Sequence, residues 1–335
     1  MKRKQINLSL TSTENMLLFI YYLEKHGITW QKEANRLSLP SEINFYEQWI
    51  PIEHFSKFVD LMRLKTKDNT LGARVGLQSG NIISNTKADK LNIVQGLESL
   101  TMSIISHSSV VSRHVSYWLE KINSKWCLCH SATIRPTFPG YDQVEWFRVS
   151  LLISIFKQTL GKDWQPNVVL LMTSEHQGRK CEKLFPKCSF IYEQEFSAIE
   201  LPLNPDFTPL HFSRSNNNNL QEILLLANSY SHLRSFNADW LASLFGTTRR
   251  TLHRYLDSHN TSFRAIKEKA RYNTAEQLLF ETSDSIDSIA FQLGYSDVAN
   301  FNRAFKSWAG VTAAAARRLY TQELEFQRRV ERGHW

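Results

Sequence analysis

The chain has 335 residues, 42% of them apolar and 12% aromatic, so it is long enough for two domains and too apolar for a globally disordered protein. Its net charge of +8 favours an anionic partner such as nucleic acid, but only weakly. Four cysteines are too few for a disulfide scaffold of this size and fit a reducing compartment.

The N-terminus does not have the pattern of a targeting segment. The basic start MKRKQINLSLTSTEN is followed by no small-residue cleavage site, and the longest early apolar run, MLLFIYYL, has only eight residues. A membrane-spanning helix needs about 20 apolar residues. We therefore expect a cytoplasmic protein that associates with the nucleoid when bound to DNA and has no membrane partner.

The first 210 residues predict an α+β domain in which helices come first and a small sheet follows. The predicted helices lie at 11–26, at 52–66, in two pieces within 91–120, and at 144–160, and the β-rich runs lie at 125–134, 167–174 and 188–196. Thr11 and Glu14 have the spacing of a capping box for the first helix. The run at 144–160 fits either a strand or a helix, and its length favours a helix.

The polar segment SRSNNNNLQ, residues 213–221, predicts a boundary between two domains. Four consecutive asparagines favour turns over packed structure, which fits either a surface loop or a linker. We expect a linker, because domains usually divide at such segments. The predicted domains are 1–212, a regulatory domain for effector binding or dimerisation, and 222–335, a DNA-binding domain with a C-terminal extension.

Residues beyond 221 predict an all-α domain, because strand signals disappear and short apolar runs alternate with polar joints. The predicted helices lie at 221–233, 237–245, 248–257, 261–281, 285–293, 297–308 and from 312 onward. The third and sixth of these helices belong to two copies of an internal repeat, LASLFGTTRRTLHRYL at 241–256 and IAFQLGYSDVANFNRAF at 289–305.

Both copies of the repeat contain an alanine, a glycine four residues later, a polar cap and two core residues four apart. These are Ala242, Gly246, Thr248, Leu252 and Leu256 in the first copy, and Ala290, Gly294, Ser296 or Asp297, Phe301 and Phe305 in the second. The alanine permits a close helix crossing, the glycine allows a tight turn, and the cap begins a second helix. Amphipathic helices with solvated charges are the alternative, but recurrence of the whole pattern favours two helix-turn-helix units.

A helical wheel assigns faces to the second helix of each copy. Phe301, Phe305 and Trp308 share the inward face of the later helix, and its outward or flanking residues are Ala299, Asn300, Asn302, Arg303 and Lys306. In the earlier helix Arg250 and Arg254 point outward, with His253 beside them. An outward arginine can pair with guanine, Asn300 with adenine, and Lys306 with a phosphate.

With these motifs the sequence resembles the AraC/XylS transcriptional regulators over residues 235–320. The resemblance is carried by IAFQLGYSD, FNRAFKSWAG, Arg271, Ala275 and the two leucines at 278–279. It implies two helix-turn-helix units joined by a long helix, about 263–281, that read successive major-groove segments of promoter DNA. By position, Arg250, His253 and Arg254 match the groove-contacting residues of the first unit, and Val298, Ala299, Asn300 and Arg303 match those of the second.

The sequence departs from the family pattern after the second unit. In GVTAAAARRLY, Ala313 and Ala316 stand where the family has proline and an aromatic residue. Alanine nevertheless favours helix, and Thr312 can cap it.

Residues 16–210 resemble the regulatory domain of VirS-like and ornithine-utilisation regulators. The motifs TLGARVGLQSG and LFPKCSFIYEQEFSAIELP carry this resemblance. That resemblance implies effector sensing or self-association.

The cysteines offer a competing chemistry. Cys127, Cys129, Cys181 and Cys188, with His130, invite comparison with DNA-repair proteins that accept a methyl group on a zinc-bound cysteine. However, WCLCHS alternates like a strand, and neither cysteine pair has the C-x2-C spacing of common zinc sites. We therefore expect buried structural thiols and no metal or cofactor.

No sequence motif for a catalytic serine, a phosphate-binding glycine loop or a zinc protease is present, so we expect no enzyme and no catalytic residue. The leading hypothesis is a sequence-specific regulator that binds double-stranded promoter DNA and responds to a small-molecule effector. RNA polymerase and a second copy of the chain are further candidate partners. The alternative is a methyl-accepting repair protein with a cysteine zinc site fused to an AraC-like domain.

Overall fold

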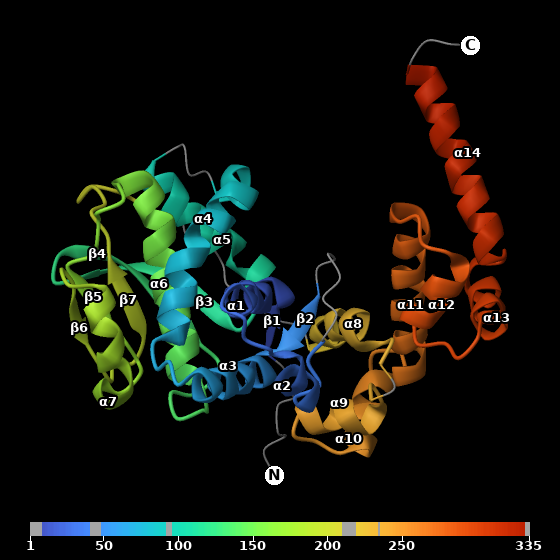
Figure 1. The fold of residues 1–335 in the computed structure, drawn as a ribbon, viewed down its shortest axis with the longest axis horizontal. Helices are drawn as coiled ribbons and strands as arrows, with labels where there is room; N and C mark the ends of the chain where they lie inside the picture. Colours follow the sequence, from blue (N-terminus) through green and yellow to red (C-terminus); the bar gives the residue numbers. More distant parts are fainter. Residues whose placement is uncertain (1–8, 41–47, 92–95, 210–218, 234, 332–335) are drawn as a thin grey trace. The chain divides into compact units, whose positions relative to one another are not determined.

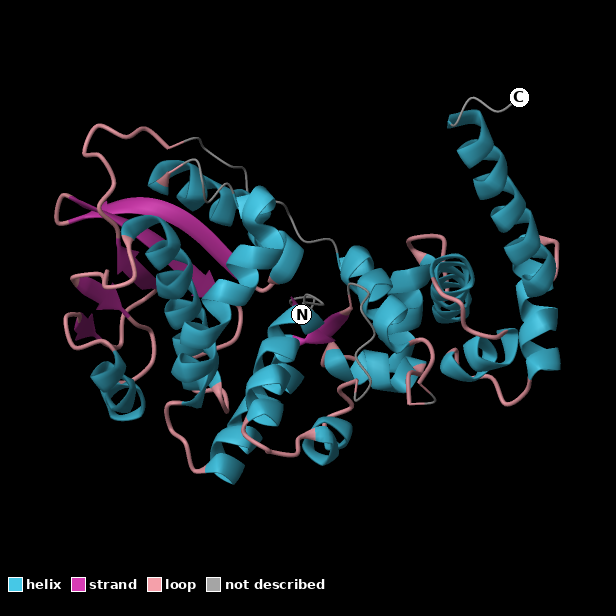
Figure 2. Ribbon diagram, turned by 45° about the horizontal axis from the view of Figure 1, so that its top comes forward, coloured by secondary structure: helices cyan, strands magenta, loops and turns pink. Residues whose placement is uncertain are grey.

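The computed structural model describes residues 9–40, 48–91, 96–209, 219–233 and 235–331. The chain divides into two compact units, Ser9–Asn217 and Asn218–Trp335. Within the described residues, strands occur in the first unit, whereas the regular structure of the second is helical (Figure 1, Figure 2). The mixed character of the N-terminal half and the helical character of the C-terminal half are both as predicted.

The predicted linker at 213–221 falls largely on residues that the structure does not describe. Its last three residues, 219–221, belong to helix α8 (Asn219–Tyr230). The helix therefore begins two residues before the predicted start at 221.

The N-terminal unit contains a five-stranded sheet, a separate strand pair and the helices that cover them. Its helices are α1 (Thr13–Lys25), α2 (Gln31–Arg36), α3 (Ile52–Thr66), α4 (Leu71–Leu91), α5 (Leu97–Val111), α6 (Tyr141–Leu160) and α7 (Glu175–Gly178), followed by a 3-10 helix at Arg179–Leu184. Its strands are β1 (Leu10–Ser12), β2 (Trp49–Pro51), β3 (Val115–Ile122), β4 (Lys125–Ala132), β5 (Val168–Leu170), β6 (Ser189–Ile191) and β7 (Ser197–Glu200).

The large sheet has the strand order β3-β4-β7-β5-β6, in which β5 and β6 are parallel and the other neighbours are antiparallel. The prediction of helix through residue 120 is wrong for its last part, because Val115–Ile122 forms β3. Asn123 and Ser124, both at positive φ, make the two-residue turn that pairs β3 with β4. Aromatic and β-branched residues next to a tight turn favour this hairpin over a helix.

Helix α6 is the centre of the N-terminal core and confirms the helix predicted for 144–160. One side packs Trp146, Val149 and Phe156 into the core cluster that includes sheet residues such as Leu128. The other side meets α4, a helix that the periodicity did not predict (Figure 1). Three glycines of α4, Gly72, Gly76 and Gly80, lie against α6, where a Cβ would overlap α6 atoms. The two helices are close because this stripe has no side chains.

The start of α1 differs from the prediction. Thr11 was expected to cap the helix, but it lies in β1, and Ser12 accepts the hydrogen bond from the Glu14 N–H at 3.1 Å instead. Pairing of β1 with β2 holds Thr11 in extended backbone, so the cap moves one residue along the chain.

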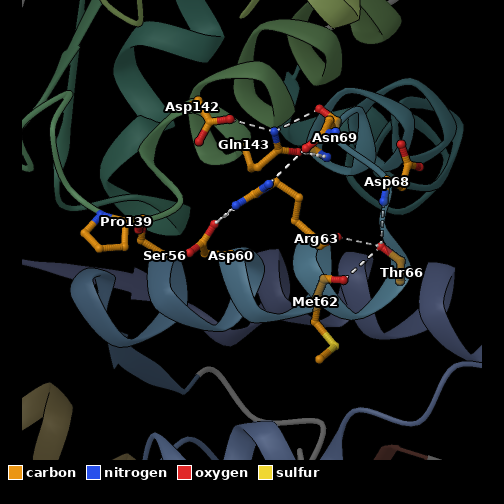
Figure 3. Close-up of polar contacts among 11 residues, drawn as sticks. Ser56, Asp60, Met62, Arg63, Thr66, Asp68, Asn69, Pro139, Asp142 and Gln143 are labelled. Carbon is orange, nitrogen blue, oxygen red and sulfur yellow. Dashed lines mark hydrogen bonds and ion pairs between the residues drawn. The ribbon is translucent and has the colours of Figure 1, made fainter. Parts of the chain in front are cut away.

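A polar network fixes the end of α3 to the start of α6 (Figure 3). The Arg63 guanidinium donates to Asp60 at 2.8 Å and to Asn69 at 2.9 Å. Gln143 donates to the Asn69 carbonyl at 3.0 Å and to the Asp142 carboxylate at 2.8 Å. These five side chains lie at or beside a surface cleft of about 360 Å³, which Lys180 and His176 also line.

The C-terminal unit contains all seven predicted helices, with ends that shift by up to three residues. They are α8, α9 (Ala238–Leu244), α10 (Arg249–Asp257), α11 (Phe263–Glu281), α12 (Ile286–Gln292), α13 (Val298–Ala309) and α14 (Ala313–Glu331). Helix α14 confirms the prediction that the chain after Thr312 remains helical with Ala313 and Ala316 in place. Thr312 accepts from the Ala315 N–H at 3.3 Å, and Ala313 is fully buried.

Candidate nucleic-acid interface

The pair α9–α10 is built as its sequence predicts. Ala242 is 2% exposed, and Gly246 takes a φ of +57° at the end of α9. The Gly246 N–H donates to Ser243 and the Thr247 N–H donates to Ala242, both at 3.0 Å, which closes the turn. Thr248 then caps α10 by accepting from the Thr251 N–H at 3.2 Å.

Helix α10 has a buried side and a charged side. Leu252 and Leu256 are each 1% exposed, whereas Arg250, His253 and Arg254 are all exposed. The guanidinium groups of Arg250 and Arg254 have no hydrogen-bond or ion-pair partner within the described part of the chain. The His253 ring, by contrast, lies 2.7 Å from the Asp257 carboxylate. The two free guanidinium groups are thus available to an external acceptor.

The pair α12–α13 repeats this backbone plan. Ala290 is fully buried, and Gly294 takes a φ of +77°. The Gly294 N–H donates to Phe291 at 2.9 Å, and the Tyr295 N–H donates to Ala290 at 3.0 Å. These two bonds reproduce the turn after α9, so the repeated sequence pattern forms the same turn twice.

The cap of α13 resolves the choice between Ser296 and Asp297. Asp297 accepts from the Asn300 N–H at 2.7 Å, while the Ser296 hydroxyl donates to the Asp297 carboxylate at 3.2 Å. The backbone N–H of Asn300 is the main cause of a pKa below the usual range for the Asp297 carboxyl. The carboxylate stays ionised near neutral pH and also favours the positive end of the helix dipole.

The buried side of α13 consists of the aromatic residues that its spacing predicted. Phe301 and Phe305 are no more than 1% exposed, with ring centroids 5.8 Å apart. Trp308 is half-buried and meets the Tyr272 ring of α11 edge-on at 6.0 Å. These contacts fix the rotation of α13 about its own axis.

The predicted contact residues on the opposite side of α13 differ in their exposure and in their hydrogen-bond partners. Ala299, Arg303 and Lys306 are exposed, and Val298 and Asn300 are half-buried. The Asn300 side chain is held between two neighbours, because its amide donates to Asp297 and its oxygen accepts from Arg303. The Asn302 side-chain oxygen is buried and has no partner among the described residues, so this end of Asn302 faces inward.

Two arginines outside the predicted contact set support this arrangement. Arg271 of α11 donates to the Ser231 carbonyl at 2.9 Å and stacks over the Tyr295 ring at 5.0 Å. Arg317 of α14 donates to the Leu279 carbonyl at 2.9 Å and the Asp284 carbonyl at 2.6 Å. Arg271 was recognised only as part of a family signature, and Arg317 was not recognised. Both bind carbonyl oxygens that lie far away in sequence, which periodicity does not reveal.

The cysteines lie in the N-terminal unit, in surroundings that keep their thiols protonated. Cys127 and Cys129 pack with Ala198 on one face of β4, and Leu128 lies in the core on the other, as the alternation predicted. Burial raises the pKa of the Cys127 thiol to about 11 and that of Cys181 to about 12. Within the described residues no group of three His, Cys, Asp or Glu side chains could hold a metal ion.

Known proteins resemble the C-terminal unit. Residues 241–319 match the family described as helix-turn-helix domain. An uncharacterized HTH-type transcriptional regulator of Mycobacterium tuberculosis, Rv1395, is 42% identical over 62 residues, 18% of this chain and 18% of the relative. The ornithine utilization regulator of Pseudomonas aeruginosa is 38% identical over 64 residues, 19% of each chain. The crystal structure of CdpR from Pseudomonas aeruginosa has 16% identity and a TM-score of 0.35, over 90% of this chain and 97% of its own.

The family match and the two curated relatives identify the class of the C-terminal domain. Residues 241–319 form an AraC-type helix-turn-helix domain, and the resemblance to the AraC/XylS family is confirmed there. The match spans less than a fifth of the length of the curated relatives. No helix in the described ranges is long and apolar enough to cross a membrane.

Proposed function

We propose that this protein is a sequence-specific transcriptional regulator that binds double-stranded promoter DNA through two helix-turn-helix units. The units are the pairs α9–α10 and α12–α13, joined by α11, with α10 and α13 as recognition helices in successive major-groove segments. The supporting observation is that both pairs repeat one turn geometry and bury one side of the second helix. The other side of each second helix carries at least one exposed arginine.

The exposed residues of α10 and α13 suggest different ways of contacting DNA. Arg250 and Arg254 have no internal partner, so each can bond guanine O6 and N7 with little competition. Asn300 is already oriented by its neighbours, which suits it to adenine, and Arg303 lies beside it. The proposed contact set is completed by His253, Val298, Ala299, Asn302 and Lys306.

We further propose that the N-terminal unit is the regulatory domain, which binds a small-molecule effector or a second copy of the chain. Its buried core contains polar side-chain atoms, among them those of Arg148 and His130, that have no hydrogen-bond partner among the described residues. Contact with RNA polymerase is a further part of the proposal, as expected for a regulator bound at a promoter.

Genome-wide footprinting of the bound protein, followed by binding assays on the sites found, tests DNA recognition. Arg250→Ala and Arg303→Ala should each weaken binding to a cognate site by about 1–3 kcal/mol and relax base preference at one position. Arg264→Ala is the matched control, because it removes the same charge from an exposed residue of α11 that pairs with Glu268. Wild-type binding by both test variants would refute the assignment of the recognition faces.

The methyl-accepting alternative has less support. A thiolate is the nucleophile in such transfer, and burial raises the pKa of the cysteine thiols and keeps them protonated. An intact-mass increase after incubation with alkylated DNA would favour that alternative over a regulator.

A further inference from the structure

A cluster of polar side chains lies inside the N-terminal unit, where apolar packing would be expected. Arg148 of α6 is 6% exposed, His114 is 3% exposed, and His130 of β4 is fully buried. Arg148 acts electrostatically on both histidines and on Tyr117 of β3, so the four side chains share one region. Three separate stretches of chain bring these groups together.

The sheet register shows how the cluster is built. Tyr117 and His130 are directly opposite each other on β3 and β4, and their ring centroids are 5.6 Å apart. His130 is also paired with Ser197 of β7, whose hydroxyl donates to Glu145 of α6. Arg148 follows Glu145 by about one turn of α6, so it lies over the same part of the sheet.

Four polar atoms of this cluster lack partners among the described residues. Nη1 of Arg148, Nε2 of His114 and both ring nitrogens of His130 are buried and form no hydrogen bond there. Glu145 interacts electrostatically with Arg148, but among the described residues no hydrogen bond or ion pair joins the two side chains. Its carboxylate oxygens accept from the N–H groups of Met172 at 2.8 Å and Thr173 at 2.9 Å, and from Ser197.

Such an arrangement is unfavourable without a further partner. An unpaired buried charge costs several kcal/mol, and each unsatisfied neutral polar group costs about 1–3 kcal/mol more. Helix α6 and the sheet could pack with apolar residues here, as they do around Val149 and Leu128. Retention of a guanidinium and two imidazoles points to an occupant that satisfies them.

The protonation states define which occupant fits. Burial, and then the charge of Arg148, lowers the pKa of His114 to about 3 and that of His130 well below its ordinary value, so both rings are neutral near pH 7. Burial raises the pKa of Tyr117, which keeps its phenol proton. Glu145 is the acidic group nearest to this cluster in the described part of the chain, but its oxygens are satisfied by other donors. The guanidinium of Arg148, with an unpartnered Nη1, is therefore the charge that still lacks a hydrogen-bonded partner, and it favours an anion over a metal ion.

His114 adds a second requirement. Its Nδ1 lies 3.2 Å from the Leu10 carbonyl, so Nδ1 carries the proton and donates. In a neutral ring Nε2 is then a bare acceptor, which needs an N–H or O–H donor rather than a second anionic oxygen. A ligand that satisfies both Arg148 and His114 has a carboxylate and a neutral donor, and a hydroxyl group supplies that donor without a second positive charge beside Arg148.

We propose that Arg148, His114, His130 and Tyr117 form the effector site of the regulatory domain, and that its ligand is a small hydroxycarboxylate. The carboxylate pairs with the Arg148 guanidinium in two parallel hydrogen bonds, the strongest geometry for this pair. The ligand hydroxyl donates to Nε2 of His114, and His130 and Tyr117 supply further neutral hydrogen-bonding groups. This inference rests on the proposed function, because it assigns the effector expected for that regulator.

Binding to the full chain tests the proposal by calorimetry and thermal shift at pH 7.5. The probes are lactate, 3-hydroxybutyrate and 4-hydroxybenzoate, with propionate, butyrate and benzoate as the respective controls without the hydroxyl and 4-hydroxybenzamide as the control without charge. We expect saturable binding of at least one hydroxycarboxylate, about tenfold weaker binding of its counterpart without hydroxyl, and none of the amide. Failure of every hydroxycarboxylate would overturn the proposal.

Variants locate the site. Arg148→Met should weaken hydroxycarboxylate binding by about tenfold or more and leave the unliganded chain as stable as wild type or more stable, because an unpaired buried charge is removed. Arg148→Lys should retain part of the affinity, since the charge remains without the planar fork. If Arg148→Met loses stability instead, the guanidinium supports the fold and the proposal is wrong.

Lys180→Ala is the control for the other possible site, because Lys180 lines the 360 Å³ surface cleft beside Asp142. It should leave hydroxycarboxylate binding unchanged, and loss of binding in this variant would place the ligand in the cleft and overturn the proposal. Promoter binding by the same preparations is measured in parallel. Intact promoter binding without ligand binding contradicts the effector site alone, whereas absent promoter binding contradicts the proposed function.

Discussion

In both helix pairs of the C-terminal unit, a glycine at positive φ ends the first helix and the same two backbone hydrogen bonds close the turn. The second helices differ. Helix α10 buries two leucines and exposes two arginines without partners, while α13 buries two phenylalanines and links its exposed Arg303 to Asn300. The two helix pairs therefore share the turn geometry that sets the angle of the second helix, and they differ in the side chains that this second helix presents. In the proposed complex the two helices would therefore present different groups to DNA.

The largest expected effect concerns the two buried sides. Phe301→Ala should destabilise the C-terminal unit by about 3–5 kcal/mol, and Leu252→Ala by about 2–5 kcal/mol, with the first loss the greater. Phe301 contacts the rings of Phe305 and Tyr295, so its removal breaks aromatic packing as well as burial. Hydrogen exchange of the full chain, followed over α8–α14, measures both losses. An equal or larger loss in Leu252→Ala would contradict the ranking.

The two turn glycines should differ although their φ angles are similar. At Gly246 an added Cβ meets nothing within 4 Å, so Gly246→Ala should cost only the strain of a left-handed conformation, about 1–2 kcal/mol. At Gly294 the Cβ would overlap the His232 carbonyl oxygen, so Gly294→Ala should cost more. Chemical unfolding of the two variants gives the comparison. Equal costs would show that the segment at His232 moves freely.

The two helix caps should differ in their dependence on pH. The pKa of Asp297 lies below its ordinary value of 3.8, chiefly because of the Asn300 N–H, so its stabilising effect is complete above 3.8 and is lost as the pH falls through the lower folded value. Thr248 does not titrate. The stability difference between wild type and Asp297→Asn should stay constant from pH 8 to pH 5 and change only in stronger acid. A change between pH 5 and pH 8 would contradict this assignment.

The smallest expected effect is on DNA binding, where substitutions of Lys306 and Arg303 on α13 should differ. A phosphate contact carries no base information, so Lys306→Ala should weaken binding to all DNA sequences alike and reduce the salt dependence of binding by about one counterion. Arg303→Ala should alter base preference as well. Titrations over a range of salt concentrations, with cognate and scrambled duplexes, distinguish these outcomes. A change in base preference for Lys306→Ala would place it among the base-reading residues.

The C-terminal helices could be predicted because their signals are local. Gly246 and Gly294, the polar caps and core residues four apart specify each turn and face within about 16 residues, and the structure has the predicted burial at both copies. The choice of Asp297 over Ser296 as the cap was open, because both residues can accept a hydrogen bond. Only the backbone angle at the turn decides which oxygen reaches the Asn300 N–H.

The N-terminal unit was predicted less well, because its decisive contacts join distant segments. The glycine stripe of α4 is meaningful only against α6, about 70 residues later in the chain. Residues 115–120 were read as part of a helical stretch, although pairing with β4 makes 115–122 a strand. A charged residue in a helical pattern ordinarily suggests a solvated face, yet α6 is covered by α4 and the sheet, and Arg148 is buried.

The sequence by itself determined the class of the C-terminal domain, its seven helices and the outward position of Arg250, Arg254 and Arg303. Helical periodicity, turn glycines and caps act over a few residues, so one chain segment contains the whole signal. Tertiary structure alone decided which cap is used and how Asn300 is oriented. It also decided that Arg148, His114 and His130 are buried, because the position of a side chain inside a fold depends on partners that the local sequence does not contain.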